Sequence, residues 1–81
     1  MEEKIVVNNI EFVKTDDVLF EYNPNYEKDI EKYKFYRYDS KKKKKIIKIK
    51  NLIKSIYITN YGNIIVKNNM IYICKVKVFE W

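Results

Sequence analysis

Residues 56–81 read IYITNYGNIIVKNNMIYICKVKVFEW, and this segment has the clearest strand-and-turn pattern of the chain. Two runs rich in β-branched and aromatic residues, Ile56–Thr59 and Ile64–Lys67, lie on either side of residues 60–63. That connection holds the only glycine of the chain, and glycine adopts the positive φ of a tight turn without steric cost. The pattern therefore predicts a β-hairpin.

The same pattern continues to the last residue. Asn68 and Asn69 tolerate positive φ and predict a second turn. Residues 70–81 alternate between two faces and predict one long strand, in which Lys75 and Lys77 share a face. The opposite face is formed by Tyr72, Cys74, Val76 and Val78. We therefore expect a meander of three antiparallel strands at the end of the chain.

The rest of the chain has the same strand-forming composition. Ile, Val, Tyr, Phe, Thr and Trp account for 35 of the 81 residues, whereas Ala is absent. Residues 5–14 predict either a hairpin that turns at Asn8 and Asn9 or a single bent strand. Further strands are predicted over residues 18–22, 34–38 and 46–50, with a connection over residues 51–55.

One segment, Tyr26 to about Lys34, has a helical pattern. Tyr26, Ile30 and Tyr33 lie on one stripe of such a helix, and Asn25 is in position to be its N-cap. The charged residues four apart carry the same sign, so we expect a short helix that depends on packing.

These elements predict an α+β, β-rich fold in a single domain, residues 1–81. We expect an antiparallel sheet of five or six strands, arranged as a meander or a partly open barrel, with one short helix near residues 26–34.

The composition excludes most kinds of active site. The chain has no His, one Cys and one Gly, so it cannot build a His-based triad, a His-ligated zinc site or a glycine-rich phosphate loop. We interpret Cys74 as a structural thiol in an apolar strand, and Asp16 and Asp17 as a turn. We therefore expect a non-enzymatic protein with no catalytic residue, metal or cofactor.

No apolar run approaches the ~18 residues that cross a membrane, and the chain opens with Met1, Glu2 and Glu3. We therefore expect a cytoplasmic protein without membrane contact.

The formal net charge of +6 divides unevenly along the chain. Residues 1–31 carry −6 and residues 32–81 carry +12, and seven of the ten residues from 41 to 50 are lysine. Lysines neutralise phosphates, and aromatic rings stack on unpaired bases. We predict that nucleic acid or another partner binds Tyr36, Arg37, Tyr38, Lys41, Lys42, Lys43, Lys44, Lys45, Lys48 and Lys50. The alternative is that the lysine run is only a solvated hairpin tip.

The sequence thus predicts a small binding protein that acts on nucleic acid or a nucleoprotein complex. By analogy of type, such basic, strand-rich chains include phage and mobile-element inhibitors of host nucleic-acid machinery, such as inhibitors of CRISPR nucleases. In that case the target is a host protein in the host cytoplasm: either the basic segment would occupy its guide-RNA or DNA channel, or an acidic surface of Asp16, Asp17 and Glu21 would meet a basic channel wall.

Two other functions remain open from the sequence. The first is a protein-only interaction module, or a homodimer formed through an edge strand, without nucleic-acid binding. The second is a metal-independent RNase toxin that would use Tyr36, Arg37, Tyr38 and Lys42. We expect the final residue, Trp81, to pack on its own fold.

Overall fold

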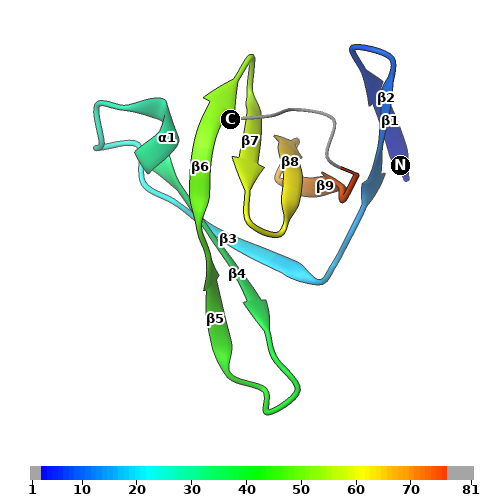
Figure 1. The fold of residues 1–81 in the computed structure, drawn as a ribbon. Coiled ribbons are helices and arrows are strands. Elements are labelled where there is room, and N and C mark those ends of the chain that lie inside the picture. The colour runs from blue at the N-terminus through cyan, green and yellow to red at the C-terminus, as the bar shows by residue number, and fades with distance from the viewer. Residues whose placement is uncertain (1–2, 77–81) are drawn as a thin grey trace.

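The computed structural model describes residues 3–76, and in this range it contains nine strands and one helix (Figure 1). The strands are β1 (Lys4–Val7), β2 (Ile10–Lys14), β3 (Val18–Tyr22), β4 (Tyr33–Tyr38), β5 (Lys44–Ile47), β6 (Ile49–Ile53), β7 (Ile56–Thr59), β8 (Gly62–Lys67) and β9 (Met70–Cys74). The helix, α1, comprises Asp29–Lys32. No helix among these residues is both long enough and apolar enough to pass through a membrane.

Six of these strands form one antiparallel sheet in the order β1-β2-β9-β8-β7-β6. The predicted sheet of five or six strands is confirmed, and β7, β8 and β9 are the predicted meander. The remaining strands form a second antiparallel sheet in the order β3-β4-β5. In the described range β1 and β6 remain edge strands, so the larger sheet is not a closed barrel.

Two-residue turns with positive φ connect three of the hairpins. Asn8 and Asn9 have φ of 52° and 64°, and Asn68 and Asn69 have φ of 53° and 61°, as expected for asparagine in tight hairpin turns. Residues 5–14 are therefore a hairpin and not one bent strand. The third turn, Lys54–Ser55, lies within the predicted connection over residues 51–55, but its positive φ is unexpected, because lysine and serine are uncommon in that conformation.

The predicted connection over residues 51–55 is wrong for its first part. Asn51, Leu52 and Ile53 pair with β7 and extend β6. The predicted strand over residues 46–50 is divided in two, because Lys48 separates β5 from β6. At this break the Lys48 N–H donates to Oδ1 of Asn60 (3.0 Å), and the Asn60 N–H donates to the Lys48 carbonyl (3.0 Å).

The helix is present but is shorter than residues 26–34. It begins after Lys28, which makes no side-chain capping hydrogen bond, so Asn25 is not its N-cap. Tyr33 and the residues after it belong to β4, where they pair with β3. Aromatic and β-branched residues prefer that extended pairing, and the helix has no capping side chain to compensate for its like-charge neighbours.

The two sheets share one hydrophobic cluster. Val18, Phe35 and Ile47 of the small sheet are buried against four residues of the large sheet, namely Tyr57, Ile64, Ile71 and Ile73. A second cluster contains Ile5, Phe12, Ile56, Ile65 and Tyr72. Its members lie on five consecutive strands of the large sheet, from β1 to β7.

The last strand is shorter than the predicted residues 70–81. β9 ends at Cys74, and Lys75 and Val76 follow it without strand pairing. The part of that prediction that concerns residues 77–81, including the role of Trp81, lies outside the described residues.

Candidate nucleic-acid interface

The small sheet has one buried face and one exposed face, because side chains alternate along each strand. The cross-strand partners Leu19, Tyr36 and Ile46 lie on the exposed face. We call this exposed side the outer face and define it as Leu19, Glu21, Lys34, Tyr36, Tyr38, Lys44 and Ile46. Tyr38 is 55% exposed and Ile46 is 58% exposed, so the outer face carries large apolar groups in solvent.

Three outer-face side chains from three strands contact one another. Lys44 Nζ lies 2.9 Å from Oε1 of Glu21 and 4.0 Å from the centroid of the Tyr36 ring. The Tyr36 hydroxyl donates to Oε2 of Glu21 (3.4 Å). The hydrogen bond from Lys44 lowers the pKa of the Glu21 carboxyl, and the same bond raises the pKa of Lys44. One of the lysines predicted to bind a partner is therefore held over an aromatic ring by a carboxylate.

The loop between β4 and β5, residues 39–43, is organised by Asp39. Its Oδ1 accepts the backbone N–H groups of Lys41 (2.9 Å) and Lys43 (3.0 Å). These bonds lower the pKa of the Asp39 carboxyl, the Lys43 N–H being the larger cause. Lys42 has a φ of 59° at the turn. A carboxylate thus fixes the backbone of a loop whose lysines remain exposed.

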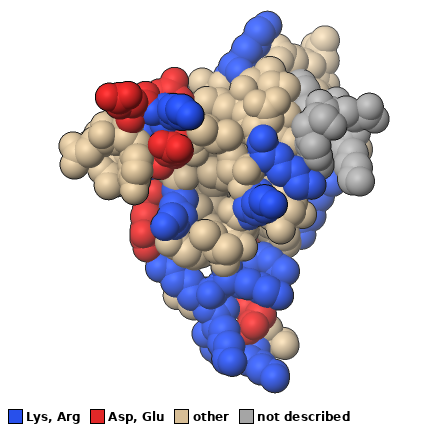
Figure 2. All heavy atoms as spheres, turned by 60° about the vertical axis from the view of Figure 1, so that its left-hand side comes forward, with Lys and Arg blue, Asp and Glu red and all other residues tan. Residues whose placement is uncertain are grey.

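This loop is the tip of a hairpin that projects away from the body of the protein (Figure 1). Figure 2 shows lysine and arginine side chains covering the projection, which is the lowest part of the molecule in that view. The residues from Lys41 to Lys45 are all exposed there. The predicted lysine run is therefore a basic tip, which by itself fits both a binding surface and a solvated loop.

Arg37 does not share the outer face with its neighbours in sequence. Its guanidinium carbon lies 4.9 Å from the centroid of the Tyr61 ring, which the Lys75 ammonium also approaches (4.6 Å). Asp16 and Asp17 line a hollow of about 280 Å³ together with Arg37. The structure therefore places Arg37 on the opposite face of β4 from Tyr36, beside carboxylates in a hollow that Tyr38 also lines.

The other predicted residues lie at different places. Lys48 is exposed at the break between β5 and β6, and Lys50 lies on β6 where the pairing with β7 shifts register. Of the three predicted acidic residues, Glu21 is paired with Lys44 on the outer face. Asp16 and Asp17 precede the opposite end of β3. The structure thus does not gather the three carboxylates into one surface.

Sequence reasoning missed a groove beside α1. It has a volume of about 710 Å³, and Tyr22, Tyr26, Ile30, Ile46 and Ile49 give it an apolar lining. Its charged lining residues are Glu21, Glu31, Lys32, Lys34 and Lys48. The sequence places Tyr26 on one stripe of a predicted helix, whereas the structure leaves it 50% exposed in a loop, and Tyr22 at the end of β3 is 54% exposed.

No group of three His, Cys, Asp or Glu side chains among residues 3–76 is arranged to hold a metal ion. Tyr57 has its pKa raised to about 12, mainly by burial, and its hydroxyl donates to the Asp29 carbonyl (3.3 Å). This tyrosine belongs to the core and connects it to α1.

Comparison with known proteins gives no match: no family model, curated protein or solved structure is significantly similar to this chain.

Proposed function

We propose that this protein is a non-enzymatic binding protein for nucleic acid, alone or within a nucleoprotein complex, and that the β4–β5 hairpin contacts the phosphates. The observation that carries the proposal is the combination on one projecting sheet of a lysine-rich tip with exposed aromatic side chains. A solvated tip alone does not account for Tyr38 and Ile46, which are more than half exposed on the adjoining face.

Binding of this kind is expected to depend little on base sequence. Arginine is the side chain that reads guanine by two parallel hydrogen bonds, and the one arginine of this chain is directed to Tyr61. Lysine contacts to phosphate give affinity without sequence information. A small protein with these properties blocks access to a nucleic acid, which is the activity required of an inhibitor of host nucleic-acid enzymes such as CRISPR nucleases.

A second candidate function is protein-only interaction. It is favoured by the position of the exposed apolar side chains, because most of the large ones among residues 3–76 lie on the small sheet and its groove. These residues are Leu19, Tyr22, Tyr26, Tyr38 and Ile46. In addition β3 and β5 are the edge strands of that sheet within residues 3–76, and an edge strand offers backbone groups to a partner strand.

The test is binding of labelled single-stranded and duplex oligonucleotides, measured by fluorescence anisotropy over a range of salt concentrations. The proposal predicts affinity that falls steeply with salt, with a slope of about 0.7 for each phosphate contacted on a single strand. A triple variant, Lys41→Asn, Lys42→Asn and Lys43→Asn, is expected to reduce that slope by about 2 for all sequences alike. Asparagine is chosen because it tolerates the positive φ at Lys42.

The matched control removes three lysines from the large sheet: Lys4→Asn, Lys54→Asn and Lys67→Asn. All three are exposed, and Lys54 has a positive φ of 46°, so the control repeats both the charge change and the backbone requirement. Equal effects of the two triple variants would show that only net charge matters. Absence of binding at low salt would reject the proposal and leave the protein-only function.

A further inference from the structure

The groove beside α1 continues the outer face of the small sheet. Glu21, Lys34 and Ile46 belong to both surfaces, so no element separates them. From the tip, a ligand that follows β5 passes Lys44 and Ile46 and reaches Lys48 at the groove. At about 3.3 Å per residue, the path from Lys44 to Lys48 is about 13 Å long.

Tyr22 is held in the groove by a packed row of aromatic rings. Its ring centroid lies 4.8 Å from that of Tyr33, which is stacked on Phe35 (6.0 Å) and meets Tyr57 edge-on (5.5 Å). Phe35 and Tyr57 are buried in the main core cluster. One side of the groove is therefore a rigid aromatic wall whose outermost ring is half exposed.

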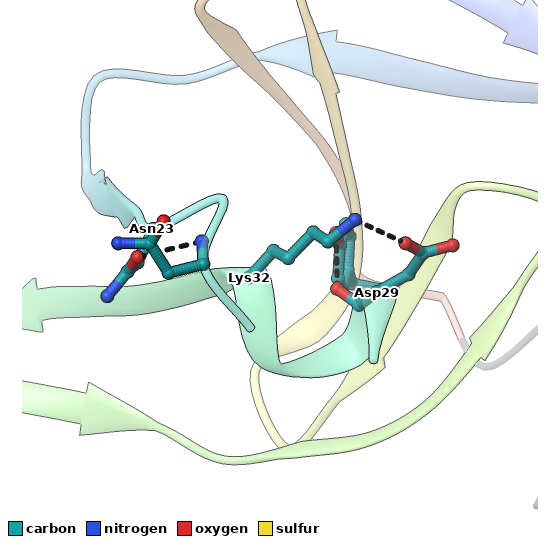
Figure 3. Close-up of polar contacts among 5 residues, drawn as sticks. Asn23, Asp29 and Lys32 are labelled. Atoms are coloured by element: carbon teal, nitrogen blue, oxygen red, sulfur yellow. Dashed lines mark hydrogen bonds and ion pairs between the residues drawn. The ribbon is translucent and has the colours of Figure 1, made fainter. Parts of the chain in front are cut away.

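Tyr26 lies in the loop between β3 and α1, and a hydrogen bond holds the start of this loop against the end of α1 (Figure 3). The Asn23 N–H donates to the Lys32 carbonyl (2.8 Å), and the Asn25 N–H donates to Oδ1 of Asn23 (3.0 Å). The Lys32 ammonium lies 3.1 Å from Oδ1 of Asp29 across the turn of α1. An exposed ring thus follows directly after a hydrogen-bonded turn, and such a constraint on the loop reduces the entropy lost when a ligand binds.

The charges around the groove favour a phosphate backbone. Three lysines and two glutamates line it, and among them Glu21 is bound to Lys44 and Lys32 to Asp29. Lys34 and Lys48 lie on the side that adjoins the basic hairpin. Glu31 is the opposing carboxylate, on α1. The positive charge is therefore concentrated where a strand would enter from the outer face.

The exposed aromatic rings of this surface favour unpaired bases over paired ones. A duplex hides the faces of its bases by stacking, whereas a single strand exposes them to aromatic side chains. On the outer face the Tyr36 ring is already covered by the Lys44 ammonium, so the half-exposed rings of Tyr22 and Tyr26 are better placed to stack on bases. Apolar side chains such as Ile30 and Ile49 complete the lining.

We propose that the nucleic acid is single-stranded and that it runs from the β4–β5 hairpin into the groove beside α1, where a base stacks on Tyr26. This inference rests on the proposed function and specifies its ligand. It assigns a second contact region to the chain, in which aromatic stacking and not phosphate neutralisation supplies the affinity.

The test compares three proteins, wild type, Tyr26→Ala and Tyr26→Phe, by anisotropy with a single strand of about 16 nucleotides, the upper end of common site sizes. Tyr26→Ala is expected to weaken binding about 5- to 150-fold, with little change in the salt slope. Tyr26→Phe keeps the ring and is expected to bind like wild type. A duplex of the same length is expected to bind more weakly than the single strand.

The matched control is Val6→Ala. Val6 is 65% exposed, and it lies on β1, at the opposite edge of the large sheet from β6, which α1 contacts. Circular dichroism of each variant checks that it is folded. Single-strand affinity that is unaffected by Tyr26→Ala, or a duplex that binds as tightly as the single strand, would overturn this inference while leaving nucleic-acid binding intact. Failure of the wild type to bind any oligonucleotide would reject the proposed function itself.

Discussion

Gly62, the single glycine of the chain, lies at a position where any other residue type is expected to destabilise the fold. Gly62 begins β8 with a φ of 135°, in a region that L-amino acids rarely occupy. A Cβ atom placed there would lie 3.0 Å from the carbonyl oxygen of Cys74 and 3.3 Å from the Cα of Lys75, both backbone atoms. The Thr59 hydroxyl donates to the Gly62 carbonyl (2.6 Å). The Gly62 backbone is therefore held by β7 on one side and lies against Cys74 and Lys75 on the other.

From this geometry Gly62→Ala is expected to lower the free energy of unfolding by roughly 2 kcal/mol. Holding a non-glycine residue in such a conformation costs about 1–3 kcal/mol. The close contact with β9 adds to that cost, because backbone atoms must shift. In the opposite direction, alanine restricts the unfolded chain and recovers about 0.4–1 kcal/mol. For a domain of this size, 2 kcal/mol corresponds to a fall in Tm of about 8–16 °C.

Urea denaturation followed by circular dichroism measures this change, with the slope m expected to stay the same. Asn69→Gly is the matched control, because Asn69 has a φ of 61°, which glycine adopts without strain. Its effect should stay within about 0.5 kcal/mol. If Gly62→Ala were equally mild, the reasoning from φ and from the contact with Cys74 would be refuted, and the turn would be able to relax.

Two further predictions concern charge and pH. Glu21→Gln removes the carboxylate that pairs with Lys44, so oligonucleotide affinity should rise and the salt slope should steepen by up to about 0.7; an unchanged slope would place Lys44 outside the interface. Tyr57 has a folded-state pKa of about 12, so the folded protein keeps a proton that the unfolded chain loses near pH 10. The contribution of Tyr57 to the free energy of unfolding is therefore fully present below about pH 10 and is lost as the pH rises toward 12. In urea titrations at alkaline pH, Tyr57→Phe should lose less stability over this range than wild type.

The turns show how far the sequence alone predicts the fold. Asparagine pairs at residues 8–9 and 68–69 mark tight hairpins by their own conformational preference, and both predictions are confirmed. Lys54 and Ser55 have no such preference, yet they adopt the same positive φ. The apolar pairing of Leu52 and Ile53 with β7 imposes that turn. The turn residues themselves gave no signal there, because the pairing of the two flanking strands sets the conformation.

The helix prediction was limited by the same difference between local and tertiary effects. A stripe of Tyr26, Ile30 and Tyr33 fits a helix on spacing alone. Pairing of Tyr33 with Tyr22 on β3 takes it into a strand instead, and Tyr26 is left exposed in a loop. The groove could not be predicted, since it exists only after the start of β4 and the break at Lys48 come together.

The candidate site was predicted as a list of residues but not as a surface. Alternation along β4 already implies that Tyr36 and Tyr38 share one face and that Arg37 points to the other. Which of the two faces is buried depends on Phe35, whose partners in the large sheet are more than 20 residues distant in sequence. The pairing of Arg37 with Tyr61 is likewise a long-range contact without a local signal.

In the folded protein the acidic and basic segments of the chain lie at opposite ends of the small sheet. The acidic residues Glu27, Asp29 and Glu31 lie in or beside α1, whereas the lysines of residues 41–45 lie at the far end of the small sheet (Figures 1 and 2). The field of this arrangement attracts a phosphate backbone to the tip first and weakens toward the groove. Under the proposed function, the tip therefore governs the salt-dependent rate of association, and the aromatic groove governs the rate of dissociation. Lys44 belongs to the lysine run and is held by Glu21 on the outer face, so it connects the tip to the surface that leads to the groove.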